Sequence, residues 1–168
     1  MKQNSILSEK NVLITGGAGY IGSLLVNLAP ENWKITVLDN CIMGNSQTHF
    51  QKNIIFVKED IRNISIVKNL IEKSDVVIHL AGIVGEASFQ KNPKAAWEIN
   101  QEATEKIVDL VKKFNKKLIF MSTCSVYGFN SEICTEETIP NPVDEYSRSK
   151  IKSEQYIQEN LENYIIFR

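Results

Sequence analysis

The chain has 168 residues, 43% of them hydrophobic, and a formal net charge of −1 at neutral pH. This length predicts one domain with a sizeable core, and the balanced charge argues against a nucleic-acid-binding surface. No stretch reaches the length of a membrane span, and Met1 to Lys10 lack the apolar core of a signal peptide. The cysteines, Cys41, Cys124 and Cys134, lack metal-ligand spacing. We therefore expect a cytoplasmic protein with reduced thiols, no metal and no membrane contact.

Segments with strand and helix patterns alternate along the chain. Helices are expected at 20–29, 65–73, 93–114 and 144–161, and a polar loop at 40–53. The expected strands are short and apolar on both faces, which is typical of a parallel sheet buried between helices. We predict a Rossmann-type, doubly wound α/β fold, with right-handed crossovers, over residues 1–168. The strands are expected at 11–15, 34–38, 54–58, 75–80, 117–122 and 164–167.

The first strand leads into glycines spaced for a dinucleotide. Gly16 permits a sharp turn, Gly19 permits close approach of a pyrophosphate, and Gly22 permits tight packing of the next helix. Tyr20 and Ile21 begin that helix, whose N-terminal N–H groups and dipole favour an anion. The GxxGxxG pattern alone is weak, but a strand before it and an apolar helix after it favour a nucleotide site.

An acidic residue, Asp39, ends the second strand about 20 residues after the glycines, where a carboxylate suits the ribose hydroxyls of NAD. It would repel the extra phosphate of NADP, and Asn40 beside it offers no positive charge. The alternative is a solvated turn aspartate. NAD is the cofactor that this position favours.

The third and fourth strands end in further candidate cofactor residues. Asp60 can accept the adenine amino group while Ile61 contacts the ring, although Asp60 is an equally good cap for the next helix. We interpret His79 as a packed or backbone-bonded histidine. Small or apolar residues follow where the cofactor must lie close to the backbone: Leu80, Ala81 and Gly82.

Three residues late in the chain are candidate catalytic groups. Tyr146 and Lys150 are four residues apart and share one helix face. An ammonium beside a phenol stabilises the phenolate and makes it a usable base. The hydroxyl of Thr123 can bind the same substrate oxygen. The YxxxK spacing alone is common by chance, and its context here makes it informative.

These segments together resemble the extended short-chain dehydrogenase/reductase family, which includes the NAD-dependent sugar-nucleotide epimerases and dehydratases. The resemblance implies a tightly held NAD and a nucleotide-sugar substrate. It implies that Tyr146 takes a proton from a sugar hydroxyl as hydride leaves for the nicotinamide. Lys150 would bind the ribose and keep Tyr146 acidic, and Thr123 would orient the substrate. The resemblance rests on residues 15–22, 38–40, 60–62, 79–82, 122–128 and 146–150, and on Asn100.

Asn100 resembles the family asparagine that steadies a helix and the active-site loop; the alternative is a solvated helix residue. Departures from the family narrow the activity. Cys124 and Ser125 stand where 4,6-dehydratases carry an Asp-Glu pair, so dehydration is disfavoured. We interpret Cys124 as a packed residue rather than a base. Val84 stands where galactose-type 4-epimerases carry a lysine, which leaves epimerisation and simple oxidation both open.

The resemblance also implies a smaller C-terminal lobe that binds the nucleotide sugar, and we expect this lobe to lie outside the 168 residues. The alternatives to an enzyme are an NAD-binding module or sensor without catalysis, and a binder of flavin or of a nucleotide alone. The family resemblance also implies a homodimer through the helices at 94–114 and 144–161. The apolar residues of those helices include Ala96, Ile99, Ala103, Ile107, Leu110, Ile151 and Ile157.

Overall fold

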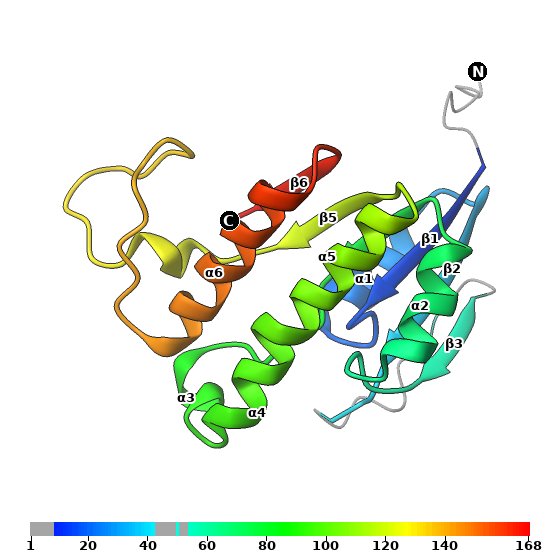
Figure 1. Cartoon of the computed structure of the whole chain (residues 1–168), viewed down its shortest axis with the longest axis horizontal. Helices are drawn as coiled ribbons and strands as arrows, with labels where there is room; N and C mark the ends of the chain where they lie inside the picture. The colour runs from blue at the N-terminus through cyan, green and yellow to red at the C-terminus, as the bar shows by residue number, and fades with distance from the viewer. Residues whose placement is uncertain (1–8, 43–49, 51–53) are drawn as a thin grey trace.

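Six strands form one parallel sheet within the residues that the computed structural model describes, 9–42, 50 and 54–168 (Figure 1). The strand order is β3-β2-β1-β4-β5-β6, and every neighbouring pair runs parallel. The chain therefore starts mid-sheet, builds outward to β3, returns to place β4 beside β1, and builds outward again. The strands are β1 (Lys10–Thr15), β2 (Trp33–Asp39), β3 (Ile55–Lys58), β4 (Val76–His79), β5 (Lys117–Met121) and β6 (Tyr164–Phe167).

Helices lie on both faces of this sheet. They are α1 (Tyr20–Leu28), α2 (Ile64–Glu72), α3 (Glu86–Phe89), α4 (Pro93–Trp97), α5 (Ala103–Lys113) and α6 (Glu145–Asn160), with a π-helical turn η1 (Glu98–Glu102) and a 3₁₀ turn η2 (Cys124–Tyr127). Buried residues of α2, α5 and α6 pack on Leu13 and Phe120 on one face. Val26 of α1 packs on Val12 and Ile14 on the other. The predicted Rossmann-type fold is confirmed.

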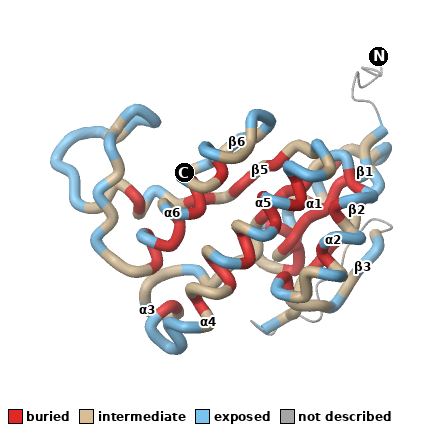
Figure 2. Tube along the Cα trace, viewed as in Figure 1, coloured by how far each residue is buried: buried red, intermediate tan, exposed pale blue. Residues whose placement is uncertain are grey.

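Burial on both faces of every strand was expected, and this is wrong at the sheet edges. Val12, Leu13 and Ile14 of the central strand β1 are all buried, and β1 is drawn largely in the red of buried residues in Figure 2. In β3, at one edge, Ile55 is 65% exposed and Phe56 is 42% exposed. An edge strand has a neighbouring strand on one side only, so its side chains have fewer groups to pack against.

The single helix predicted over 93–114 is three consecutive helical segments. Pro93 does lie in the first turn of α4, and the Asn92 side chain caps that turn by accepting from the N–H of Ala95 at 3.2 Å. The path then widens into the π turn η1 before α5 begins. Sequence periodicity misses this turn because the apolar pattern continues through it, and π turns are often found at functional sites. The short elements α3 and η2 were not predicted.

The apolar residues considered for a dimer interface lie mostly inside this chain. Those at positions 96, 99, 103, 107, 110 and 157 are all buried, and only Ile151 is partly exposed. The exposed positions of α5 are mainly charged, including Lys106, Asp109 and Lys113. Pairing through these helices stays a prediction, and it would have to use this charged face.

Some expectations concern residues outside the described part of the chain. The absence of a signal peptide concerned 1–10, of which 1–8 are not described, and the polar loop at 40–53 falls mostly on 43–49 and 51–53. Among the described residues, the helices are too short or too polar to cross a membrane.

We predict that Gly22→Ala destabilises the fold, because its Cβ would lie 2.5 Å from the Gly17 Cα and 2.7 Å from the Gly16 carbonyl oxygen. These are backbone atoms, so the glycine loop has to shift, at a cost of about 1–3 kcal/mol. Urea unfolding measures the loss. Gly19→Ala is the control, since its nearest contact is 3.2 Å away and its effect should be smaller. Equal losses would contradict the packing role of Gly22.

Candidate functional site

A cavity of about 470 Å³ opens at the carboxyl ends of the strands, within the usual size range of ligand pockets. It lies at β1 and β4, where the strand order reverses, which is where open α/β sheets bind ligands. Every predicted cofactor residue except Asn100 contributes to its lining. These residues are Gly16, Gly19, Tyr20, Ile21, Gly22, Asp39, Asn40, Asp60, Ile61, Leu80, Ala81, Gly82, Tyr146 and Lys150.

The glycine loop has the geometry of a phosphate cradle. Gly16 adopts φ +70°, and a Cβ there would lie 2.6 Å from the Ala81 nitrogen, so only glycine fits. Gly19 is the N-cap of α1, which has no side-chain cap and no acidic residue in its first turn. The first N–H groups of α1 are therefore free of a competing carboxylate and suit an anion. These observations fit a bound dinucleotide.

Asp39 lies at the end of β2 and contacts the glycine loop. Its carboxylate accepts hydrogen bonds from the N–H of Ala18 at 3.0 Å and from the N–H of Cys41 at 2.8 Å. Among the described residues that line the cavity, Lys150 is the one cation, and it belongs to α6. This part of the wall thus has a fixed negative charge with no arginine for an additional phosphate, in keeping with the choice of NAD over NADP.

Asp60 is already engaged by protein donors. Its Oδ1 accepts from the backbone N–H and from Nε of Arg62, both at 2.9 Å. Its Oδ2 accepts from Nη2 of Arg62 at 2.9 Å and from the Asn40 amide at 3.0 Å. The Arg62 hydrogen bond is the largest cause that lowers the Asp60 pKa to about 2. A carboxylate offers about four acceptor positions, so contact with adenine has to displace a donor. The alternative of a helix cap is wrong: Asn63 is the N-cap of α2, because Asp60 turns back onto Arg62.

Tyr146 and Lys150 share one face of α6 and line the cavity together. Thr123, at the start of η2, is not a lining residue, but it makes a hydrogen bond with the Tyr146 side chain. Burial raises the pKa of the Tyr146 phenol, and the hydrogen bond with Thr123 opposes that rise. The structure thus brings the three predicted catalytic residues into one neighbourhood, with the phenol held in its protonated state.

Lys150 is 4% exposed, and its ammonium is held by groups from β5. Its Nζ donates to the Met121 carbonyl at 2.8 Å and lies 4.6 Å from the centre of the Phe120 ring. Burial lowers the pKa of Lys150 to about 8, and the negative charge of Glu154 opposes this shift. Lys150 therefore stays mostly protonated at neutral pH.

Glu154 was not predicted, although it lies one turn after Lys150 on the same helix face. It is 1% exposed, and its Oε1 accepts from the Ser122 hydroxyl. Its Oε2 accepts from both Nη2 and Nε of Arg168, at 2.7 and 2.9 Å, in an ion pair. Arg168 also donates to the Tyr127 hydroxyl at 3.2 Å. The spacing of 146, 150 and 154 on one helix face was the available signal, but the partners of Glu154 come from distant segments of the chain.

Asn100 lies beneath the cavity and is 1% exposed, so it is not a solvated helix residue. Its side chain accepts from the Ile83 N–H at 2.7 Å and donates to the Ile83 carbonyl at 2.9 Å. Its backbone carbonyl, in the π turn, accepts from the hydroxyls of Thr104 and Ser153. Asn100 thus fixes the loop that forms one wall of the cavity.

The fully buried His79 is packed as expected, but side-chain hydroxyls bind it rather than backbone groups. The Thr104 hydroxyl donates to Asn100, so the His79 Nε2 is the donor to Thr104 at 2.9 Å. Nδ1 then accepts from the Thr15 hydroxyl at 2.6 Å, and Thr15 accepts from the Ala81 N–H at 3.3 Å. Burial, followed by the charge of Lys150, lowers the His79 pKa to about 3, so the ring is neutral.

Cys124 is exposed, so its interpretation as a packed residue is wrong. It begins the η2 turn, where the chain leaves the sheet and has no covering element among the described residues. The sequence reasoning also missed several lining residues, because they are ordinary apolar or polar residues brought together by the fold. They include Cys41, Ile42, Glu59, Ile83, Val84, Ile99, Met121 and Ser122. Within the described residues, no group of three His, Cys, Asp or Glu could hold a metal ion.

Comparison with known proteins finds one matching family and several relatives of similar sequence. Residues 12–167 match the NAD dependent epimerase/dehydratase family. The chain is 33% identical to a UDP-glucose 4-epimerase of Cyamopsis tetragonoloba, over 90% of this chain and 47% of that protein. It is 34% identical to a putative UDP-glucose 4-epimerase of Methanocaldococcus jannaschii, over 88% of this chain and 50% of that protein.

Solved structures agree with these relatives. The UDP-N-acetylglucosamine 4-epimerase from Methanobrevibacter ruminantium M1 aligns with a TM-score of 0.86 and 28% identity, over 96% of this chain and 55% of that one. The UDP-glucuronic acid 4-epimerase from Bacillus cereus, in complex with UDP-glucuronic acid and NAD, aligns with a TM-score of 0.83 and 30% identity, over 94% and 55%. The chain therefore spans about half the length of the relatives that it matches.

We predict that the Lys150 ammonium titrates near pH 8, well below its ordinary pKa of 10.5. Between these values the unfolded chain binds more protons than the folded chain, so this residue makes the protein more stable as pH rises from 8 to 10.5. NMR of lysine labelled with ¹³C at Cε measures the midpoint. Glu154→Gln should lower that midpoint, because it removes the charge that favours the ammonium.

Glu159→Gln is the matched control, since Glu159 is an exposed carboxylate on the same helix. It should leave the Lys150 midpoint in place. A Lys150 midpoint near 10.5 in the unaltered chain would contradict the burial of its charge.

Proposed function

Because the chain belongs to the NAD dependent epimerase/dehydratase family, we propose that it binds NAD and supplies the catalytic residues for oxidation at a carbon of a nucleotide-activated sugar. The observation that carries this proposal is the position of Tyr146 and Lys150 in the same cavity as the glycine loop. A nucleotide site next to an acid–base pair is the arrangement that hydride transfer from a sugar hydroxyl carbon requires. The 168 residues then form the NAD-binding part of a longer architecture.

The residues of the cavity would divide the binding of NAD among them. The glycine loop and the N-terminus of α1 suit the pyrophosphate, and Asp39 suits a ribose diol. Lys150 would reach the second ribose. NAD, when bound, supplies the acceptor for the hydride.

Tyr146 would accept the proton of the sugar hydroxyl at its phenolic oxygen. The hydroxyl of Thr123 would bind the same sugar oxygen and orient it toward the phenol. A protonated tyrosine has to lose its own proton first, and burial works against that loss. On this proposal the ammonium of Lys150 would favour the phenolate once the phenol loses its proton. The pKa of Lys150, about 8, keeps most of that ammonium charged at neutral pH. The proton then leaves the substrate as the carbon–hydrogen bond breaks, and a carbonyl forms.

Epimerisation is the overall reaction that the relatives favour, because those named above are 4-epimerases of UDP-sugars. In that reaction the carbonyl is reduced again from the opposite face. Dehydration stays disfavoured, since Cys124 and Ser125 supply no carboxylate pair beside Thr123. We propose a UDP-sugar as the substrate class.

We expect the unaltered chain to bind NAD much more tightly than NADP, as measured by calorimetry and by identifying the nucleotide released on denaturation. Asp39→Ala should weaken NAD binding by about 1–3 kcal/mol, the cost of a lost charged hydrogen bond. Asp39→Asn is the control, because it keeps an acceptor for the Ala18 N–H while it removes the negative charge. Asp39→Asn should reduce the ratio of the affinity for NAD to the affinity for NADP. Equal affinity of the unaltered chain for both cofactors would contradict the assignment.

We expect Tyr146→Phe to leave NAD binding nearly intact and to lower turnover of a UDP-sugar by about 10²–10⁴-fold, because it removes the atom that accepts the proton. Lys150→Ala should weaken NAD binding as well as turnover, and Thr123→Val should mainly slow turnover. The assay uses a protein that contains this chain and has the full length of its relatives. Normal turnover by Tyr146→Phe would contradict the role of Tyr146 as the base, whereas no turnover by the unaltered protein would support a binding module without catalysis.

A further inference from the structure

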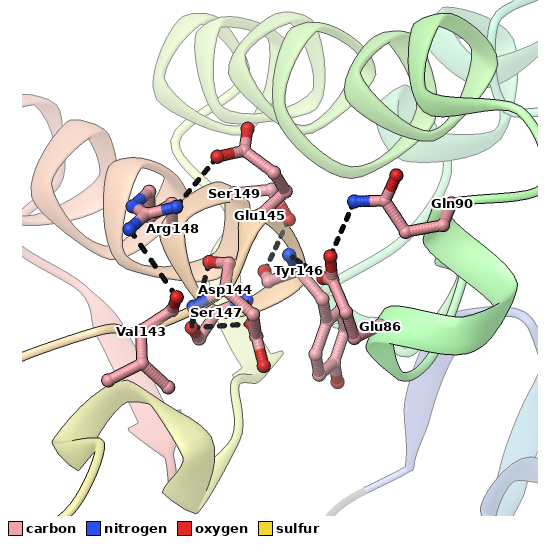
Figure 3. Close-up of polar contacts among 9 residues, drawn as sticks. All are labelled: Glu86, Gln90, Val143, Asp144, Glu145, Tyr146, Ser147, Arg148 and Ser149. Atoms are coloured by element: carbon pink, nitrogen blue, oxygen red, sulfur yellow. Dashed lines mark hydrogen bonds and ion pairs between the residues drawn. The ribbon is translucent and has the colours of Figure 1, made fainter.

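A carboxylate from a distant segment completes the N-terminus of α6. The capping box of Asp144 and Ser147 satisfies the Ser147 N–H at 2.7 Å and the Asp144 N–H at 3.4 Å. The N–H of Tyr146 lies between them and is one of the donors that a helix start leaves open. Glu86, 60 residues earlier, accepts that N–H at 3.0 Å, and Figure 3 shows its carboxylate beside the Tyr146 backbone.

Glu86 is itself held in place on its own side of this contact. The Gln90 amide, one turn later, donates to its second oxygen at 2.5 Å, so both carboxylate oxygens have a protein partner (Figure 3). Gly85, before it, adopts φ +80°, although a Cβ there would meet nothing within 4 Å. The backbone angle, rather than space, therefore favours glycine at this turn into α3.

The same segment forms a wall of the cavity and packs around the Tyr146 ring. Ile83, three residues before Glu86, lines the cavity and is bound at both its N–H and its carbonyl by Asn100. Phe89, at the end of α3, forms one buried cluster with Tyr146. The segment thus contacts both the backbone of Tyr146, through Glu86, and the ring of Tyr146, through Phe89.

We propose that Glu86 is a positioning residue for Tyr146. By accepting the Tyr146 backbone N–H, Glu86 connects the segment that forms the cavity wall at Ile83 to the residue that carries the phenol. The inference rests on the proposed function, since it assigns a reason for holding Tyr146. A carboxylate at this place also interacts favourably with the positive end of the α6 dipole. Glu86 acts through Tyr146 and touches no reacting atom.

The test measures Tyr146 itself in the 168-residue chain. Glu86→Ala should speed hydrogen exchange of the Tyr146 amide by about 10- to 100-fold, the range for loss of a hydrogen bond to a charged group. It should also move the titration midpoint of the phenol, followed with ¹³C at Cζ of tyrosine, to higher pH, because a displaced ring loses the hydrogen bond with Thr123 that lowers its pKa. Glu86→Gln keeps an acceptor oxygen and should recover most of both properties.

Glu145→Gln is the matched control. Glu145 lies in the same first turn of α6, and its carboxylate pairs with Arg148 at 2.7 Å (Figure 3). Its removal costs the helix the same charge, and it should leave Tyr146 exchange and titration unchanged. Tyr146 values in Glu86→Ala that equal those of Glu145→Gln would overturn the proposal.

A second variant keeps the proposal open to test if Glu86→Ala does not fold. Gln90→Ala releases one oxygen of the Glu86 carboxylate, and faster exchange of the Tyr146 amide supports the proposal, whereas unchanged exchange overturns it. NAD binding is measured on the same samples. Failure of the unaltered chain to bind NAD would count against the proposed function while the exchange data still decide the role of Glu86.

Discussion

The buried ammonium of Lys150 is the constraint on which the arrangement of α6 against β5 and β6 depends. A charge with so little exposure is costly unless other groups replace its water, and the Met121 carbonyl and Glu154 do so here. Glu154 is buried in turn and needs Arg168, which stands at the end of β6. One helix face therefore contacts the ends of β5 and β6, because the carboxylate of Glu154 lies between the positive charges of Lys150 and Arg168.

A second buried polar network, made of uncharged groups, lies at the carboxyl ends of β1 and β4. His79 joins Thr15 at the end of β1 to Thr104 of α5, and Thr104 continues the chain of hydrogen bonds to the carbonyl of Asn100. Each of these buried groups has its partner, and satisfied networks of this kind make a site rigid. The π turn that carries Asn100 is therefore supported from the strands and by Ser153 of α6.

The fold could be predicted from the sequence because it depends on local signals: alternating apolar segments, a glycine loop and caps. The lining of the cavity by Asp39 was predictable because the strand ends of a parallel sheet meet at one edge. The lining by Tyr146 and Lys150 was predictable because a spacing of four residues places them on one face of a helix. The contacts of Glu86 and Glu154 were not, because each depends on residues far away in the chain. The engagement of Asp60 by Arg62 is local, but a spacing of two residues does not specify that the two side chains turn toward each other.

On the proposed function, geometry and protonation at Tyr146 depend on separate contacts. Glu86 and the packing of Phe89 fix where the phenol lies, and neither supplies a positive charge to make it more acidic. The charge comes from Lys150, whose pKa near 8 leaves it protonated at neutral pH by a narrow margin that Glu154 widens. The contacts that position Tyr146 and the residue that supplies the charge belong to different segments. A change in the cavity wall can therefore shift the position of Tyr146 without altering the charge of Lys150. A change at the end of β6 acts on the charge through Arg168 and Glu154 instead.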